Sequence, residues 1–172
     1  PTSLLLPSFP PLLCSVPPLL PFEFWHLSPG PVVSEPPGPR LLAPPRGLGF
    51  WGRSGRCDMA GARAMHAAFG LKLTFCFDLA AGEYHTNVVL SVLAGRAVSI
   101  CPDGFADASV VDAIASLYTP HVILLDHAEK LAFAGNCIAP TIDTVWMSEV
   151  AADALRPSSR AGFEGRGLTV GT

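Results

Sequence analysis

The stretch that decides the fold runs over residues 84–148 and opens with the sequence YHTNVVL at residues 84–90. A second segment, FAGN, follows at residues 133–136. Asn87 and Asn136 open two similarly patterned segments, about fifty residues apart. A fixed period of this length is typical of repeated supersecondary units, so we expect a repeat architecture or a propeller-like array.

The first repeat is predicted as a strand–strand–helix–strand unit. One face of its first strand is mostly apolar, and the other is more polar and places His85 beside Asn87. Asp107 is expected to cap the helix, whose apolar residues form one stripe. The last strand is wholly apolar, which suits a sheet interior. The predicted elements of this unit are residues 85–93, 96–101, 107–118 and 122–125.

A second unit of the same kind is predicted after a short helical turn that Asp126 starts. Ser148 is expected to cap its first helix, and Pro157 to begin the next. The elements of this unit are residues 136–139, 144–147, 148–155, a helix from residue 157, and 167–170. Before both units, a helix is predicted over residues 59–69. An alternating strand over residues 71–78 is expected to be half-buried.

Residues 1–58 differ in composition from the rest of the chain. Fourteen of the 18 prolines lie in residues 1–50. Such a segment is expected to be disordered with polyproline-II character, or extraneous to the working protein. Its prolines argue against a membrane-spanning helix, and it lacks the basic start of a signal peptide. The GLGFWG sequence at residues 47–52 is interpreted as a chance match to a dinucleotide-binding motif. We therefore predict one α/β domain over residues 59–172.

Charge and cysteine usage exclude several classes of function. The net charge is −3 and the isoelectric point is about 5.9, so no basic face for nucleic acid is implied. The five cysteines are widely and irregularly spaced. This spacing indicates neither a disulfide framework nor a metal site, and it favours reduced thiols in a cytoplasmic protein without a cofactor.

The ordered pair of EYHTNVV at residues 83–89 and FAGN at residues 133–136 resembles the guanidino-group-modifying superfamily. This superfamily includes arginine deiminases, dimethylarginine dimethylaminohydrolases and amidinotransferases. The resemblance covers residues 71–170. It implies a partial α/β propeller of the pentein type, with about two of five units present, and an active site in the central channel. A small arginine-like guanidine is the implied partner, rather than nucleic acid or a membrane.

The resemblance also implies a nucleophilic mechanism. A cysteine thiolate attacks the guanidinium carbon, a histidine protonates the departing amine, and carboxylates hold the planar guanidinium. His85 occupies the position of the family's histidine and is the one catalytic residue that can be carried over. The family's cysteine lies in a glycine-rich segment near the carboxyl end, and its acidic residue in an earlier Glu-Gly-rich segment. This sequence contains no match to either segment. We therefore expect a fragment of such an enzyme that is inactive as given.

Three cysteines are candidates to replace the missing nucleophile: Cys76, Cys101 and Cys137. Each falls in or beside an apolar strand, so a buried, inert thiol is expected. Asn87 and Asn136 are expected to order turns rather than to contact substrate, and no substrate-binding residue is assigned. Two alternatives stay open beside the enzyme: a non-catalytic pentein-like binding module, and a truncated gene product without independent function.

Overall fold

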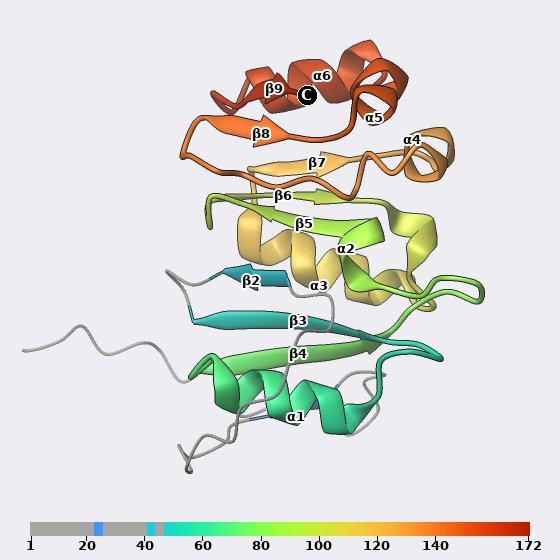
Figure 1. The fold of residues 1–172 in the computed structure, drawn as a ribbon, viewed down its shortest axis with the longest axis vertical. Coiled ribbons are helices and arrows are strands. Elements are labelled where there is room, and N and C mark those ends of the chain that lie inside the picture. Colours follow the sequence, from blue (N-terminus) through green and yellow to red (C-terminus); the bar gives the residue numbers. More distant parts are fainter. Residues whose placement is uncertain (1–22, 26–40, 44–46) are drawn as a thin grey trace, which may run out of the picture.

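The computed structural model describes residues 23–25, 41–43 and 47–172. These residues form an α/β fold of small open sheets stacked along the long axis of the molecule (Figure 1). The strand orders are β1-β4-β3-β2, β5-β6-β7 and β8-β9, and none of the sheets in this part of the chain is closed. An α/β fold built of small sheets agrees with the predicted class. The five-bladed propeller stays a prediction.

Three successive units share one topology, in which the first two strands are antiparallel and the third is parallel to the second. In unit 1, β2 is antiparallel to β3 and β4 is parallel to β3. In unit 2, β5 is antiparallel to β6 and β7 is parallel to β6. In unit 3, Ile138 forms an antiparallel bridge with Trp146, and β9 is parallel to β8. The sequence predicted only the last two of these units.

Unit 1 begins before the predicted domain boundary. Its elements are β2 (Leu41–Ala43), β3 (Leu48–Arg53), α1 (Met59–Ala68) and β4 (Leu73–Asp78), and β1 (Glu23–Trp25) pairs with β4 at the edge. The predicted boundary at residue 58 is therefore wrong for residues 47–58, which are part of the sheet and its connection to α1. The other residues of the proline-rich segment, 1–22, 26–40 and 44–46, lie outside the described residues.

The glycines at residues 47–52 serve close packing. A Cβ atom on Gly49 would lie 2.5 Å from Leu71 Cδ1, and one on Gly52 would lie 2.6 Å from Leu79. These approaches let α1 and the chain after β4 close onto β3. The glycine-rich sequence, which resembled a nucleotide-binding loop, is a buried strand, consistent with our interpretation that the motif match arose by chance.

Strand β4 is buried on both faces, which corrects the prediction of a half-buried strand. Helix α1 covers Cys76, and the remaining residues of this small core are Trp51, Cys57, Ala62, Met65 and Leu71. The opposite face belongs to the main core. There Phe50 contacts both Phe75 and Tyr118, with ring centroids 6.4 and 6.3 Å apart, and thereby joins unit 1 to unit 2.

Unit 2 corrects the predicted first strand. Its elements are α2 (Thr86–Val89), β5 (Leu90–Leu93), β6 (Ala97–Ile100), α3 (Ala108–Tyr118) and β7 (Val122–Leu124). Residues 86–89 form a helical turn instead of the start of a strand, and the turn is attached to unit 1, where Thr86 Oγ1 accepts a hydrogen bond from the backbone of Gly52 at 2.8 Å. Asp107 caps α3 as predicted. Strand β7 lies at the edge of its sheet rather than in the interior, and Leu124 is 53% exposed.

Unit 3 follows α4 (His127–Leu131) and comprises β8 (Thr144–Trp146), α5 (Glu149–Ala154), α6 (Pro157–Glu164) and β9 (Thr169–Gly171). Ser148 caps α5 and Pro157 begins α6, as predicted. The predicted strand over residues 136–139 is reduced to the single bridge at Ile138. Part of this backbone contacts unit 2 instead, because the carbonyl oxygens of Gly135 and Cys137 lie 2.7 and 2.9 Å from the Ser91 hydroxyl, which can donate to them.

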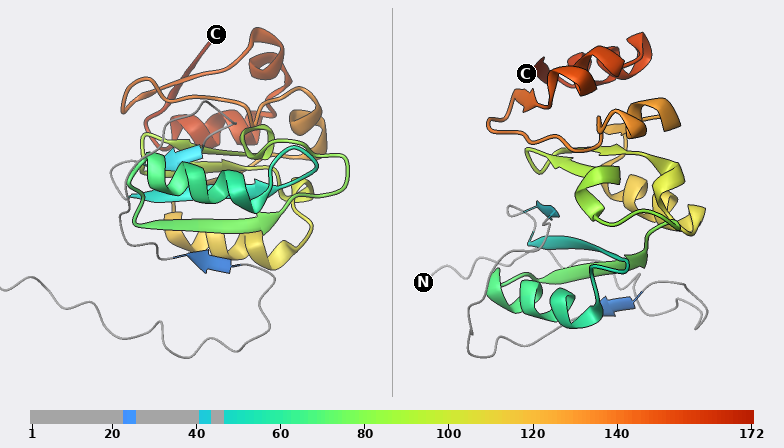
Figure 2. Two further views of the ribbon diagram at one scale, coloured as in Figure 1. Left: turned by 60° about the horizontal axis from the view of Figure 1, so that its bottom comes forward. Right: turned by 45° about the vertical axis from the view of Figure 1, so that its right-hand side comes forward.

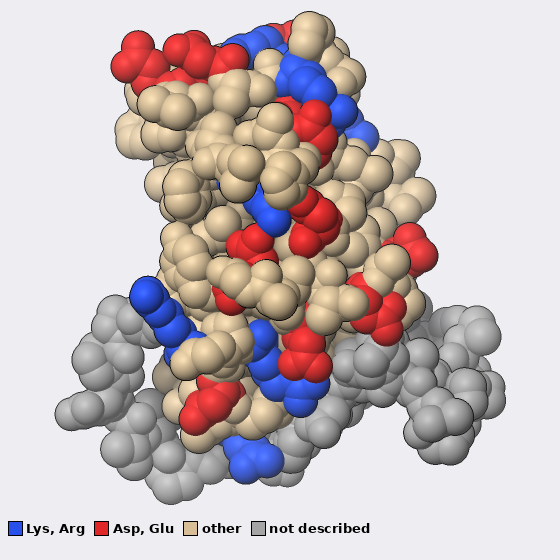
Figure 3. Space-filling view, turned by 90° about the vertical axis from the view of Figure 1, so that its right-hand side faces the viewer, with Lys and Arg blue, Asp and Glu red and all other residues tan. Residues whose placement is uncertain are grey.

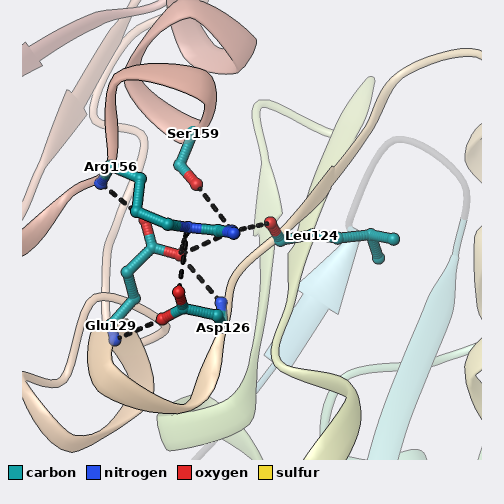
Figure 4. A network of polar contacts seen from close by, with 5 residues as sticks. All are labelled: Leu124, Asp126, Glu129, Arg156 and Ser159. Atoms are coloured by element: carbon teal, nitrogen blue, oxygen red, sulfur yellow. Dashed lines mark hydrogen bonds and ion pairs between the residues drawn. The ribbon is translucent and has the colours of Figure 1, made fainter.

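A polar network also joins α4 to the start of α6 (Figure 4). The Glu129 carboxylate is fully buried and accepts hydrogen bonds from the backbone of Asp126 and from both the backbone and guanidinium of Arg156, at 2.7 to 3.0 Å. The Asp126 side chain caps α4 in return, at 2.9 Å from the Glu129 nitrogen. Among the described helices, none is long and apolar enough to cross a membrane.

Candidate functional site

Five consecutive residues, Glu83 to Asn87, form the meeting point of the three units, and we call them the hub segment. The segment leaves the loop after β4 and runs into α2, so it lies between unit 1 and unit 2 (Figure 2). Every one of its side chains or carbonyl groups contacts a residue of a different part of the fold. The hub segment therefore gathers polar groups at the junction of the repeats.

Tyr84 and His85 contact the turn that follows β3. The Tyr84 carbonyl oxygen accepts from Ser54 Oγ at 2.8 Å and lies 3.7 Å from Cys57 Sγ. Cys57 Sγ is also 3.7 Å from His85 Nδ1. The two aromatic rings meet edge to face at 4.8 Å, and the Arg56 guanidinium lies 5.3 Å from the centre of the Tyr84 ring.

His85 lies in extended backbone directly before α2, not on the polar face of a strand as predicted. Its imidazole has a pKa below the ordinary value, mainly because burial disfavours the charged ring and also because the positive charge of Arg56 is close. A hydrogen bond to the Tyr84 backbone acts in the opposite direction. The ring is thus held neutral at neutral pH, the form that can accept a proton.

Asn87 reaches across to unit 3. Its Nδ2 donates to Asn136 Oδ1 at 3.1 Å, although the two residues are 49 positions apart. The period found in the sequence therefore corresponds to a direct contact in the structure. The joint is tight here, because a Cβ on Gly135 would lie 2.2 Å from the Val88 carbonyl oxygen.

Glu83 begins a chain of charged groups that leads away from His85. It pairs with Lys130 Nζ at 2.6 Å, and Lys130 also lies 3.4 Å from Asp103. Burial opposes ionisation of Asp103, but its contacts with His127 and Lys130 outweigh that effect and lower the pKa of the carboxyl. The matching contacts with Glu83 and Asp103 raise the pKa of Lys130 against its own burial.

Charges of both signs alternate over the face shown in Figure 3, and acidic and basic side chains lie beside each other there. In the part of the chain that the structure describes, no group of three His, Cys, Asp or Glu side chains is arranged to hold a metal ion.

Cys76, Cys101 and Cys137 are all buried, as predicted. Burial is the main cause that raises the pKa of Cys101 to about 12, and burial also raises the pKa of Cys137. A thiol in this state is a poor nucleophile, because the thiolate is the reactive form. The cysteine that does contact His85, Cys57, was not found by sequence reasoning. No spacing rule connects residues 57 and 85, whose contact depends on how the turn after β3 is folded.

No protein-family model matches the sequence, and no curated protein matches it. Solved structures do resemble this fold. The N-terminal domain of ArgZ with bound substrate, from an arginine dihydrolase of the ornithine–ammonia cycle in cyanobacteria, has a TM-score of 0.65 and 17% identity. That match covers 78% of this chain and 47% of the other. AgrE in complex with ornithine and NAD⁺ has a TM-score of 0.66 and 19% identity over 83% of this chain and 20% of its own.

A third structure is SxtG, an amidinotransferase from Microseira wollei in the saxitoxin biosynthetic pathway. It has a TM-score of 0.54 and 11% identity, over 72% of this chain and 37% of its own. The chain thus spans less than half the length of each of these proteins. The resemblance predicted from residues 83–89 and 133–136 is confirmed at the level of the fold. The chain has the fold of part of these guanidine-modifying enzymes of the pentein type.

Proposed function

We propose that the chain is part of a guanidine-modifying protein of the arginine amidinohydrolase or amidinotransferase type, and that His85 is its acid–base residue. The observation that carries the proposal is the set of polar groups that the hub segment brings together. The segment brings a histidine with a lowered pKa, two asparagine side chains and a partly buried ion pair to the junction of three repeated units. Sites built at the junction of packed units are held by several elements at once, which suits precise orientation of a small ligand.

The chemistry that such a site would perform follows from the guanidinium group. A guanidinium is planar and cationic, and a nucleophile that attacks its central carbon expels an amine, which must receive a proton. A histidine whose pKa lies near or below neutrality can take a proton from the nucleophile or from water and pass it to that amine. His85 is proposed for this role.

The alternative is a non-catalytic binding module, and one observation favours it. Two of the described cysteines, Cys101 and Cys137, lie beside the joint of units 2 and 3, are buried and have raised pKa values. Neither is in the thiolate form that nucleophilic catalysis requires. Residues 1–172 would then bind a guanidine without converting it.

Titration with L-arginine, followed by NMR on the ¹⁵N-labelled chain, tests the proposal. We expect shifts of the amide signals of residues 83–87 and of the Asn136 side chain. L-citrulline is the matched control, because it has the same length but carries no guanidinium charge. It should bind at least tenfold more weakly. Arginine that shifts only signals far from the hub segment, or none, contradicts the proposal.

An assay for ureido products separates the two candidate functions. We expect no citrulline from arginine or from methylated arginines, because the described cysteines are buried and the pKa values of Cys101 and Cys137 are raised. Product that disappears in His85→Ala and persists in a variant without cysteines would contradict the thiolate mechanism. Product that disappears in Cys137→Ser would show that this buried thiol is reactive after all.

A further inference from the structure

The thiol of Cys57 is held in a fixed position against the hub segment. Cys57 is only 5% exposed. Two backbone hydrogen bonds between Ser54 and Cys57, of 3.1 and 3.3 Å, close the turn that follows β3. The place of the sulfur is therefore set by the backbone of unit 1, while its two polar contacts, with Tyr84 and His85, lie in the segment that leads into unit 2.

The donors and acceptors at this contact can be assigned from their chemistry. A thiol carries a single hydrogen, and a backbone carbonyl oxygen can only accept. The hydrogen of Cys57 therefore points to the Tyr84 oxygen, which also accepts from Ser54 at 2.8 Å. The sulfur then has only its lone pairs to offer to His85 Nδ1, so that ring nitrogen must be the donor.

We propose that Cys57 is a positioning residue that holds His85 in the tautomer with its proton on Nδ1. In neutral imidazole one nitrogen donates and the other accepts, so this tautomer leaves Nε2 free to take a proton. The catalytic use of Nε2 rests on the proposed function above. The assignment of the tautomer does not, because it rests only on the contacts of Cys57. Arg56 and Tyr84 are the other charged or titratable groups that face the ring.

The contact orders the ring without the chemical features of a nucleophile–base pair. The distance of 3.7 Å is that of a sulfur hydrogen bond, and the thiol is nearly closed off from solvent. The opposite assignment, with the thiol donating to Nδ1, would place the imidazole proton on Nε2. His85 would then be unable to accept a proton from a ligand on that side, and the two assignments predict different spectra.

The ¹⁵N chemical shifts of the His85 ring, measured on the full chain at pH 8, decide between the two tautomers. We expect the wild-type ring to be protonated at Nδ1. Cys57→Ser keeps a group that can both donate and accept, so the tautomer should persist. Cys57→Val removes both functions and should shift the population at least fivefold toward the Nε2-protonated form.

Cys76→Val is the matched control, because Cys76 lies in the same small core but on β4 under α1. It should leave the His85 tautomer unchanged. An Nε2-protonated wild-type ring, or a tautomer that is the same in wild type and Cys57→Val, overturns the proposal. If Cys57→Val does not fold, Cys57→Ala removes the same two functions with a smaller side chain, and an unchanged tautomer in that variant overturns the proposal. Absence of arginine binding together with the expected tautomer would count against the proposed function alone.

Discussion

The pKa of His85 is set by residues that the chain brings to it from another unit. Burial and the positive charge of Arg56 both lower it. The unfolded histidine titrates at its ordinary value, so below about pH 6.5 the unfolded state binds more protons than the folded state. His85 therefore favours folding at neutral pH, and its contribution is progressively lost as the pH falls below that value.

Removing the charge of Arg56 should raise the pKa of His85 toward its ordinary value. We expect Arg56→Gln to move the imidazole titration upward in pH, as measured by NMR on the ring protons. Arg160→Gln, which removes a charge from α6 in unit 3, is the control and should leave the titration unchanged. An unchanged or lower His85 pKa in Arg56→Gln would show that Arg56 exerts no electrostatic effect on the ring.

The buried thiols should be chemically silent in the folded chain. At pH 8, Cys101 is far below its pKa of about 12 and is buried together with Cys137. We expect neither to react with iodoacetamide in the native state and both to react in urea, as read by peptide mapping with mass spectrometry. Rapid native labelling of Cys101 or Cys137 would contradict their burial.

At the scale of single elements, the joint between α4 and α6 depends on one buried carboxylate. The Glu129 carboxylate accepts hydrogen bonds from the Arg156 guanidinium and from the backbone nitrogens of Asp126 and Arg156. Arg156→Met leaves that carboxylate with fewer donors and should lower the free energy of unfolding by about 2–3 kcal/mol.

Urea denaturation measures this loss, and a second substitution identifies its cause. Arg156→Met combined with Glu129→Gln removes the stranded charge and should recover part of the stability. The single variant Glu129→Gln is the reference. If Glu129→Gln lowers the free energy of unfolding of the Arg156→Met variant by as much as it lowers that of the wild type, the two residues do not interact as described.

In strand β8, neighbouring side chains differ sharply in their exposure to solvent. Val145 is fully buried, whereas Trp146 is 54% exposed and lies over Gly171. Val145→Ala should cost about 2 kcal/mol in the free energy of unfolding, because it leaves a cavity. Trp146→Ser should cost about 1 kcal/mol or less. Equal losses in chemical denaturation would contradict the alternating exposure of this strand.

At the scale of the whole molecule, the three units are locked together by close backbone contact as well as by apolar packing. The main core is continuous through all three units. The approach of Gly135 to the Val88 carbonyl oxygen, at the joint of units 2 and 3, leaves no room for a side chain. Since the obstructing atom belongs to the backbone, the joint itself must shift to accommodate one.

Gly135→Ala should therefore destabilise the chain by about 3 kcal/mol and weaken the contact between Asn87 and Asn136. Gly55→Ala is the matched control, because a Cβ there meets nothing within 4 Å. Thermal unfolding compares the two variants, and NMR reports the Asn87 side-chain amide. Equal melting temperatures for both variants would mean that the units are not packed as closely as described.

The sequence by itself determined the features that depend on neighbouring residues. The caps at Asp107, Asp126 and Ser148 follow from local hydrogen bonds, and the structure has all three. The period of the repeat and the fold resemblance also followed from short, local patterns.

Only the tertiary structure decided which distant groups meet. The segment at residues 48–53 reads as a glycine-rich loop, but pairing with β4 and packing under α1 make it a strand. Residues 86–89 are predicted as a strand, but they form a helical turn whose Thr86 accepts a hydrogen bond from Gly52 in unit 1. The contact of Cys57 with His85 likewise joins residues that are 28 positions apart. The physical reason is that burial and long-range hydrogen bonds outweigh local preferences of a fraction of a kilocalorie per residue.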